Sequence, residues 1–321
     1  MFIARVITIR LFCRPIDRFQ RGVNMGHAKH VVETFKNTKL PCMGKYVLLE
    51  FVGGNIFRAA NVDTGKELIC KVFNITRYWE SLAAYFRVPV NTNTDQIVDT
   101  VFGDSMAYVF FEHCYGDLHA YVRSMKKIRE DEAVKLFHQI VSVVAHCHDY
   151  GVVLMDLKLK RLVFKDEDRR HLRLDTLEDA HVSEQEGGDC PARKHACPIY
   201  TSPETLQEEE EEGVRVSSGK TADVWCLGVM LYTILVGHYP FNDMDLTSLF
   251  RKIKRCKLSL PDMLSPKANC LLHSILRSDP LERLTAREIL DHPWFSTSAL
   301  TGNMRGDASE ARDQLVPNIP C

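Results

Sequence analysis

Two charged side chains in this sequence have the chemistry needed to handle phosphate groups. Lys71 lies in the short apolar run 69–72, and Asp156 lies in the run Asp156-Leu157-Lys158. A lysine ammonium neutralises phosphate oxygens, and an aspartate accepts a hydroxyl proton or ligates Mg²⁺. Together they would suit transfer of a phosphoryl group, provided that other residues supply the metal ligands.

The order of further segments along the chain matches one architecture. After Lys71 and Asp156 come Ser202-Pro203-Glu204, the run Asp223-Val224-Trp225 with Gly228, and Arg283. In this order they resemble the protein kinases, in which such an arginine pairs with such a glutamate. The resemblance implies structural roles for Glu204, Asp223 and Arg283. It also implies an α+β, bilobal protein-kinase-like fold with a small β-rich N-lobe and a larger helical C-lobe.

The residues that should hold magnesium are missing from this kinase-like pattern. Kinases use an asparagine five residues after the catalytic aspartate and the aspartate of an Asp-Phe-Gly motif. Here those positions are occupied by Arg161 and by Thr176, Leu177 and Glu178. A guanidinium cannot ligate a metal, and a threonine hydroxyl is a poor substitute for a carboxylate. We therefore expect no catalytic residue and no metal site.

Two other departures affect nucleotide binding and regulation. Residues 51–57 contain no G-x-G-x-x-G, and bulky Ile56 and Phe57 stand where backbone should approach a nucleotide. Met155 replaces the arginine that usually receives an activation-loop phosphate. The vestigial Lys71 and Asp156 then have two interpretations: weak ATP binding without magnesium, or persistence as a structural ion pair and a hydrogen-bonded loop.

The departures themselves form a pattern. It includes the runs 154–161 (Leu-Met-Asp-Leu-Lys-Leu-Lys-Arg), 174–179 (Leu-Asp-Thr-Leu-Glu-Asp) and 194–198 (Lys-His-Ala-Cys-Pro). The runs 116–119 (Gly-Asp-Leu-His), 145–148 (Ala-His-Cys-His) and 219–225 (Gly-Lys-Thr-Ala-Asp-Val-Trp) belong to it as well. With these motifs the chain resembles the Tribbles pseudokinases over residues 44–295 and at the extreme C-terminus.

The resemblance implies an adaptor without phosphoryl transfer. Tribbles proteins hold a substrate on the pseudokinase domain and recruit an E3 ubiquitin ligase of the constitutive-photomorphogenesis type through an Asp-Gln-x-Val-Pro tail motif. Here that motif would be supplied by Asp313, Gln314, Val316 and Pro317. Val316 and Pro317 would be apolar anchors, and a linker of about 17 residues would span about 23 Å. The alternative is a chance match in a disordered tail.

A second family motif ends the kinase-like region. The resemblance assigns binding of MAP kinase kinases to Ile289, Leu290, Asp291, His292, Pro293, Trp294 and Phe295. The alternative is core packing, because kinases often end their last helix with His-Pro-Trp-Phe against the domain. The family's cargo is the CCAAT/enhancer-binding class of transcription factors, expected on the C-lobe around residues 176–204. Protein kinase B is a further possible partner.

The predicted elements change from strands to helices along the chain. β-type runs occur at 46–51, 68–73, 97–102 and 107–111, with a hairpin turn at 63–66. Helical periods follow at 130–148 and 221–236, and a small hairpin joins 162–164 to 172–174. A capping box at Thr285 and Glu288 opens a last short helix that Pro293 should stop.

These elements predict three regions. A basic N-terminal extension covers 1–43, and a pseudokinase domain covers 44–295, with its N-lobe at about 44–114 and its C-lobe at about 115–295. A flexible tail covers 296–321. Residues 1–45 carry nine basic and two acidic side chains. A disordered or regulatory extension is favoured over a mitochondrial presequence, which stays open.

Composition limits the classes of partner and compartment. The 321 residues carry 41 Lys and Arg against 42 Asp and Glu, so we expect no nucleic acid partner. The longest apolar run, 226–237, is shorter than the roughly 20 residues of a membrane span, so we expect a core helix and no membrane partner. Eleven scattered cysteines favour reduced thiols and a location in cytoplasm and nucleus.

Two clusters that could suggest metal chemistry have a simpler interpretation. Cys190 and Cys197 lack a second Cys/His pair, so a zinc site is not expected. The glutamate run 208–212 is expected to be a solvated loop, because adjacent carboxylates have no fixed geometry.

The sequence leaves three functions open. The first is the ligase-recruiting adaptor, which requires no cofactor. The second is a weak kinase that binds ATP without magnesium, with Lys71 and Arg161 each neutralising part of the phosphate charge. The third is an inhibitor that sequesters upstream kinases and needs no ligase.

Overall fold

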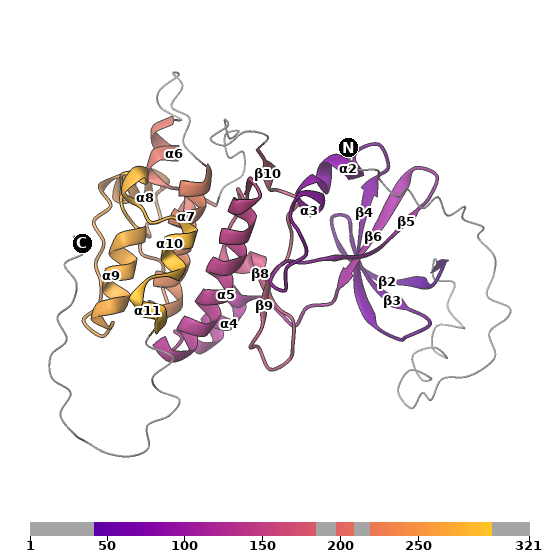
Figure 1. Cartoon of the computed structure of the whole chain (residues 1–321), viewed down its shortest axis with the longest axis horizontal. Helices are drawn as coiled ribbons and strands as arrows, with labels where there is room; N and C mark the ends of the chain where they lie inside the picture. The colour runs from indigo at the N-terminus through magenta and orange to yellow at the C-terminus, as the bar shows by residue number, and fades with distance from the viewer. Residues whose placement is uncertain (1–41, 184–196, 209–218, 297–321) are drawn as a thin grey trace, which may run out of the picture. The chain divides into compact units, whose positions relative to one another are not determined.

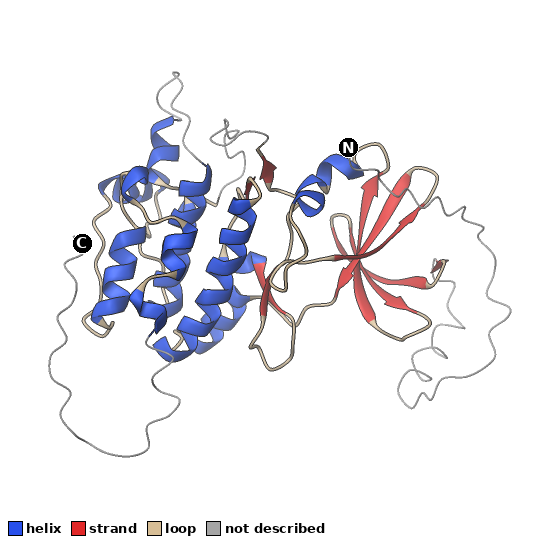
Figure 2. Cartoon of the chain, in the orientation of Figure 1, coloured by secondary structure: helices blue, strands red, loops and turns tan. Residues whose placement is uncertain are grey.

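The computed structural model describes residues 42–183, 197–208 and 219–296. The chain divides into two compact units, one formed by residues up to 83 with 95–113, the other by 84–94 with the residues from 114 onward. The first unit is built on strands and the second mainly on helices (Figure 2). The chain therefore has the mixed α+β fold that its segment order predicts.

The first unit contains a six-stranded antiparallel sheet with the order β1-β2-β3-β4-β6-β5 (Figure 1). The aromatic ring of Tyr46 stacks on Phe110, with centroids 3.9 Å apart, in a small core that also holds Leu68 and Cys70. The elements are β1 (Cys42–Met43), β2 (Tyr46–Gly53), β3 (Ile56–Asn61), β4 (Glu67–Asn74), α2 (Tyr78–Ser81), β5 (Ile97–Phe102) and β6 (Met106–Glu112).

The hairpin of β2 and β3 contains a strand that is absent from the predicted elements. Ile56 and Phe57 begin β3, where Phe57 pairs with Phe51 across the hairpin. Gly54, with a φ of 61°, makes the tight turn between the strands. Asn55 holds the hairpin to β4, because its Nδ2 donates to the carbonyl of Val72 at 3.0 Å. The predicted turn at 63–66 lies between β3 and β4.

The second unit is organised around two long helices, α5 and α7, which lie side by side (Figure 1). Its helices are α3 (Ala83–Arg87, at the boundary of the units), α4 (Leu118–Met125), α5 (Glu130–Asp149), α6 (Pro203–Glu208), α7 (Gly219–Val236), α8 (Leu246–Arg255), α9 (Pro266–Ile275), α10 (Ala286–Leu290) and α11 (Pro293–Ser296). Short strands complete it: β7 (Val152–Val153), β8 (Leu162–Phe164), β9 (Leu172–Leu174) and β10 (His181–Val182). Single 3₁₀ turns occur at Leu159–Arg161, Pro198–Tyr200 and Pro280–Glu282.

Residues 84–94 pack with the second unit, although the predicted boundary places them in the first lobe. The amide of Leu174 donates to the carbonyl of Asn93 at 2.9 Å, and Lys165 Nζ donates to that of Thr92 at 3.0 Å. Arg87 Nε donates to the carbonyl of Tyr150 at 3.1 Å. These bonds fix the segment to β8, β9 and the end of α5.

Helix α7 is the core helix of the second unit. Its 18 residues are long and apolar enough to cross a membrane by length and composition, but 83% of them are buried inside the fold. Gly228 lets α9 approach closely, since a Cβ there would lie 2.7 Å from side-chain carbons of Ile275 and Leu276. Burial within the protein explains the apolar run that the sequence contains.

The last two helices change one expectation. The capping box is present: Glu288 accepts a hydrogen bond from the amide of Thr285, whose hydroxyl accepts one from the amide of Glu288. The expectation that Pro293 stops the helix is wrong, because α10 already ends at Leu290 and Pro293 begins α11. Proline suits a first helical position, where no amide donor is needed.

Candidate functional site

The loop that carries Asp156 is hydrogen-bonded to a buried carboxylate. Asp223 of α7 is fully buried, and its Oδ2 accepts hydrogen bonds from the amide of Leu154 at 2.7 Å and from His148 Nε2 at 3.1 Å. Met155, next in the loop, has a φ of 62°, which few non-glycine residues adopt. Asp223 thus fixes the backbone just before Asp156 through its bond to the Leu154 amide.

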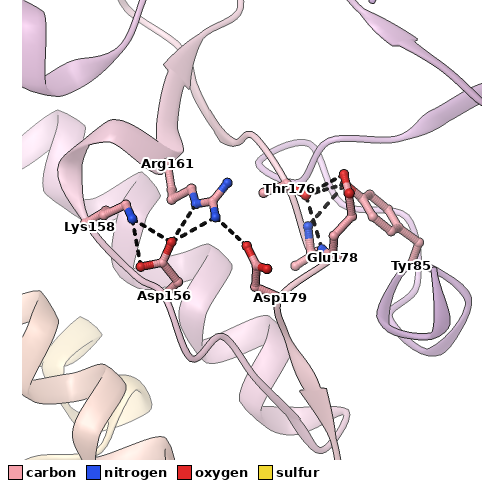
Figure 3. A network of polar contacts seen from close by, with 8 residues as sticks. Tyr85, Asp156, Lys158, Arg161, Thr176, Glu178 and Asp179 are labelled. Carbon is pink, nitrogen blue, oxygen red and sulfur yellow. Dashed lines mark hydrogen bonds and ion pairs between the residues drawn. The ribbon is translucent and has the colours of Figure 1, made fainter. Parts of the chain in front are cut away.

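Both oxygens of Asp156 are engaged by cations of the same unit (Figure 3). Lys158 Nζ donates to Oδ1 at 2.8 Å and to Oδ2 at 2.6 Å. Arg161 donates to Oδ2 from Nε at 3.0 Å and from Nη2 at 2.8 Å. The catalytic-type aspartate is therefore already neutralised by two side chains within five residues of it.

Arg161 joins this carboxylate to a second one, since its Nη2 also pairs with Asp179. Burial alone would lower the pKa of Arg161. The hydrogen bond and charge of Asp156, with the charges of Asp179 and Asp175, raise it by more. The pKa of Arg161 therefore lies above its ordinary value. The guanidinium is a permanent cation at the position where kinases place a metal-binding asparagine.

The Thr176–Glu178 turn, at the Asp-Phe-Gly position, has hydrogen bonds within itself and with Tyr85 of the same unit (Figure 3). Thr176 Oγ1 donates to Glu178 Oε1 at 3.0 Å and accepts from the Glu178 amide at 3.1 Å. The hydroxyl of Tyr85 donates to Thr176 Oγ1 at 3.4 Å and accepts from the Leu177 amide at 3.1 Å. Leu177 itself is 2% exposed. The turn is thus closed on itself and held to α3.

These residues do not fit a magnesium ion. Mg²⁺ requires oxygen ligands in octahedral geometry, whereas Arg161 brings nitrogen donors and a positive charge. Both carboxylate oxygens of Asp156 face cations, and Thr176 contributes only a hydroxyl that already bonds Glu178. Within the described residues, no group of three His, Cys, Asp or Glu side chains could hold a metal.

Lys71 belongs to the first unit. It lies on β4 opposite Val109 of β6, is 5% exposed, and its Nζ stands 4.8 Å from the centroid of the Phe111 ring. A cation over an aromatic face is stabilised by the ring quadrupole. The sheet therefore gives Lys71 a fixed position.

Glu204 and Arg283 form the buried pair that the sequence places at these positions. Arg283 Nη1 and Nη2 donate to Glu204 Oε1 and Oε2, each at 2.6 Å, and both residues are less than 10% exposed. Arg283 also donates to the carbonyls of Arg277 at 2.8 Å and Thr221 at 3.0 Å. Its guanidinium lies 5.0 Å from the Trp225 ring. The pair joins α6 to α7 and the segment before α10.

The segment to which the resemblance assigns binding of MAP kinase kinases is partly buried in the core. Ile289 is fully buried and Trp294 is 1% exposed, and the Trp294 ring meets Phe137 of α5 at 6.0 Å. Asp291 and Pro293 are the exposed members, and Leu290, His292 and Phe295 are half-buried. Core packing accounts for Ile289 and Trp294, and a partner could reach mainly Asp291 and Pro293.

Several predicted features lie outside the described residues. They are the tail motif at Asp313, Gln314, Val316 and Pro317, residues 1–41, most of the glutamate run, Cys190 and the 194–196 part of the Lys-His-Ala-Cys-Pro run.

Four contributors to the site carry no obvious sequence signal for their roles. Tyr85 lies 91 residues before Thr176, so only the fold reveals their contact. Lys158 and Asp179 stand inside the motif runs, but their ion pairs with Asp156 and Arg161 cannot be read from spacing. His148 ends the Ala-His-Cys-His run, and that position is the one clue to its bond with Asp223.

The class of the protein follows from four features: the sheet unit, the helical unit, the Asp156 loop bonded to a carboxylate of the core helix, and the buried Glu204–Arg283 pair. This is a protein kinase domain. The family model for the protein kinase domain matches residues 52–295.

Comparison with curated proteins narrows the class. The chain is 53% identical over 279 residues to Tribbles homolog 2 of Canis lupus familiaris, covering 87% of this chain and 80% of the relative. It is 49% identical over 263 residues to Tribbles homolog 1 of Homo sapiens, covering 82% and 69%. It is 43% identical over 281 residues to Tribbles homolog 3 of Mus musculus, covering 87% and 77%. The chain belongs to the Tribbles family of pseudokinases.

Proposed function

We propose that this protein is a non-catalytic adaptor, which holds a substrate protein on its kinase-like domain and recruits an E3 ubiquitin ligase through its tail. The observation that carries the proposal is the double engagement of Asp156 by Lys158 and Arg161. An aspartate held by two cations is a poor proton acceptor, and the cation Arg161 repels the Mg²⁺ that a phosphoryl transfer needs.

The tail supplies the recruiting element of this proposal. Asp313, Gln314, Val316 and Pro317 form a short peptide whose apolar pair would enter a pocket while the aspartate meets a basic rim. The partner is an E3 ligase of the constitutive-photomorphogenesis type. A tether of about 17 residues raises the effective concentration of ligase beside bound cargo.

The cargo would be a transcription factor of the CCAAT/enhancer-binding class. It would bind the second unit near the segment 176–204, at whose start the Tyr85 hydroxyl donates a hydrogen bond to Thr176. Cytoplasm and nucleus are the compartments in which such an adaptor would meet both cargo and ligase.

Binding of a tail peptide to the ligase tests the recruiting step. A peptide of residues 313–321 should bind the substrate-recognition domain of the ligase saturably, and Val316→Ala should weaken binding by about tenfold or more, as expected for a buried anchor. Leu315→Ala, at the unspecified position of the motif, is the matched control and should bind like the parent peptide. Equal binding by all three peptides would rule out the tail as the recruiting element.

A second candidate function, weak ATP binding without magnesium, is favoured by one observation. Lys71 keeps a fixed and buried position on β4, where a kinase lysine would meet phosphates. Titration of ATP with and without Mg²⁺, followed by thermal unfolding, distinguishes nucleotide binding from an adaptor that needs no nucleotide. A stabilisation that magnesium does not increase and that Lys71→Ala removes would support nucleotide binding. Phosphate transfer lost in Asp156→Ala would contradict the adaptor proposal.

A third candidate, sequestration of MAP kinase kinases or protein kinase B, depends on the exposed Asp291 and Pro293. Deleting residues 313–321 separates it from the adaptor, since signalling effects should persist if sequestration suffices. The double variant Asp291→Ala/Pro293→Ala should then remove capture of the kinase.

A further inference from the structure

The carboxylate of Glu130 joins three separate parts of the second unit. Glu130 is the first residue of α5, and its Oε1 accepts hydrogen bonds from Ser265 Oγ at 2.5 Å and from Trp294 Nε1 at 2.7 Å. Ser265 is the N-cap of α9, and Trp294 belongs to α11. One negative charge thus holds the last described helix to the start of two others.

Ser265 also has the features of a phosphorylation site. It precedes Pro266, and the sequence has one other Ser-Pro pair, at Ser202. Ser202 is 1% exposed, whereas Ser265 is half-buried at the end of an irregular segment whose Met263 is 58% exposed. With φ of −63° and ψ of 152°, Ser265 already has the extended conformation that the following proline favours.

We propose that Ser265 is a phosphorylation site for a proline-directed serine/threonine kinase, and that its phosphate releases Trp294 from Glu130. In the reaction, Ser265 Oγ attacks the γ-phosphorus of ATP bound to the acting kinase. The new Oγ–P bond forms as the bond from the γ-phosphorus to the β,γ-bridging oxygen breaks. ADP leaves, and the hydroxyl proton passes to the base of that kinase.

Phosphorylation removes one bond and adds a repulsion. The hydroxyl proton that Ser265 donates to Glu130 is lost, and a group with a charge of about −1.5 to −2 at pH 7 takes its place beside the carboxylate. Like charges in contact at a partly buried site repel each other. Because Oε1 of Glu130 is also the acceptor for Trp294, moving the carboxylate breaks that bond as well.

The surroundings offer the phosphate an alternative partner. Glu130 and Leu264 line a cavity of about 500 Å³ together with the basic residues Lys127 and Arg129. Arg129 pairs with Asp131 at 3.1 Å, in an exposed contact that a phosphate with two negative charges can replace. The α9 N-terminus continues to favour a negative charge at Ser265, so α9 itself should stay folded.

Release of Trp294 would loosen α11, from which the chain continues into the tail. An effect of this loosening on ligase recruitment is the one step that rests on the proposed function. The tests below read Ser265 and Trp294 directly, so they succeed or fail independently of ligase binding.

The first test asks whether Ser265 is modified. The full chain is incubated with an active kinase of the MAP-kinase class and ATP, and the sites are mapped by mass spectrometry. We expect phosphate on Ser265, lost in Ser265→Ala, and none on Ser202. Efficient phosphorylation of a peptide of residues 258–272, together with an unmodified Ser265 in the full chain, would overturn the proposal.

The second test asks whether the charge releases Trp294, using variants matched in shape. Ser265→Asp and Ser265→Asn both cap a helix, but only Asp adds a charge. Amide exchange over residues 290–296 should be about tenfold faster in Ser265→Asp than in Ser265→Asn, consistent with like-charge repulsion. In a Glu130→Gln background, which keeps an acceptor oxygen without the charge, the two variants should exchange equally.

A third readout follows Trp294 itself. The chain has three tryptophans, so 5-fluorotryptophan labelling gives three ¹⁹F resonances, assigned with Trp79→Phe and Trp294→Phe. Phosphorylation of Ser265 should shift the Trp294 resonance and leave that of exposed Trp79 in place. Stoichiometric phosphate on Ser265 with an unchanged Trp294 resonance would overturn the release mechanism.

Discussion

Arg161 donates two hydrogen bonds to a single oxygen of Asp156, from Nε at 3.0 Å and from Nη2 at 2.8 Å. The geometry gives the aspartate a cationic partner that belongs to the same loop. A kinase aspartate must instead be available to its substrate hydroxyl, with metals nearby to balance the phosphate charge. The contact between these two residues thus gives Asp156 a partner inside its own loop and places a positive charge at the position where kinases hold a metal ligand.

Restoring the metal ligands should restore a response to magnesium. In the double variant Arg161→Asn/Thr176→Asp, Mg²⁺ should raise the ATP-dependent unfolding midpoint by a few degrees, as a ligand present at about ten times its Kd would. The parent protein should show no magnesium-dependent increase, and neither should Arg161→Asn alone. Thermal unfolding with ATP, with and without Mg²⁺, measures this. A magnesium-dependent increase in the parent would show that Arg161 does not block the site.

The buried pair of Glu204 and Arg283 should dominate the stability of the second unit. Glu204→Ala or Arg283→Ala should lower the free energy of unfolding by about 3–5 kcal/mol, because each leaves a buried charge without its partner. The double variant should lose less than the sum of the two. Arg287, whose pair with Asp149 is exposed, is the matched control, and Arg287→Ala should cost less than about 1 kcal/mol. Urea unfolding provides all four values.

The hydroxyl of Tyr85 should hold the turn at the Asp-Phe-Gly position. Tyr85→Phe removes the acceptor of the Leu177 amide and should cost about 1 kcal/mol, with faster exchange of that amide. Tyr121→Phe, which loses a hydroxyl bonded to Glu132 at 2.7 Å, is the control for removing a tyrosine hydroxyl elsewhere in the unit. If Leu177 exchanges equally in both variants, another contact holds the turn.

Acid should weaken the last helices through His292. Burial, and next the charge of Lys267, lower the pKa of His292 below its ordinary value of 6.5. The unfolded chain therefore takes up a proton at higher pH than the folded chain. The contribution of neutral His292 to the free energy of unfolding is fully present above about pH 6.5. It is lost as the pH drops toward the lowered pKa of the folded state.

The mechanism of this acid sensitivity is local. Neutral His292 accepts a hydrogen bond from the Trp294 amide at its Nδ1, at 3.2 Å, and protonation removes that acceptor. His292→Asn keeps an acceptor and does not titrate, so its unfolding free energy should change less between pH 7.5 and pH 5.5 than that of the parent. An identical pH dependence in both proteins would contradict the assignment to His292.

Local pattern predicted the elements that have strong periodicity. The runs at 97–102, 162–164 and 172–174 match β5, β8 and β9, and the helix predicted at 130–148 ends one residue later, at Asp149. β3 was absent from the prediction because Ile56 and Phe57 were assigned to the phosphate loop by analogy. The unpredicted helix α4 has only Leu118 and Val122 buried, which is too weak a stripe to detect.

For the candidate site, the sequence predicted which kinase residues are replaced and one contact, the pair of Glu204 and Arg283, but not the other contacts. The sequence shows that Arg161 and Thr176 replace metal ligands, since this needs only their positions. That Arg161 reaches Asp156 and Asp179, or that Tyr85 reaches Thr176, depends on side-chain placement across large separations. The same holds for Glu130, Ser265 and Trp294, which are brought together from positions up to 164 residues apart.

The burial of α7 has a consequence for biosynthesis. This helix satisfies the length and composition of a membrane span and is hidden only by the rest of its unit, much of which follows it in the chain. A nascent chain that stops before α9 therefore exposes the apolar surface of α7. Chaperones would recognise the incomplete chain first at this helix. Truncations between residues 237 and 265 should accordingly be degraded or aggregate, even though the sheet unit is already complete.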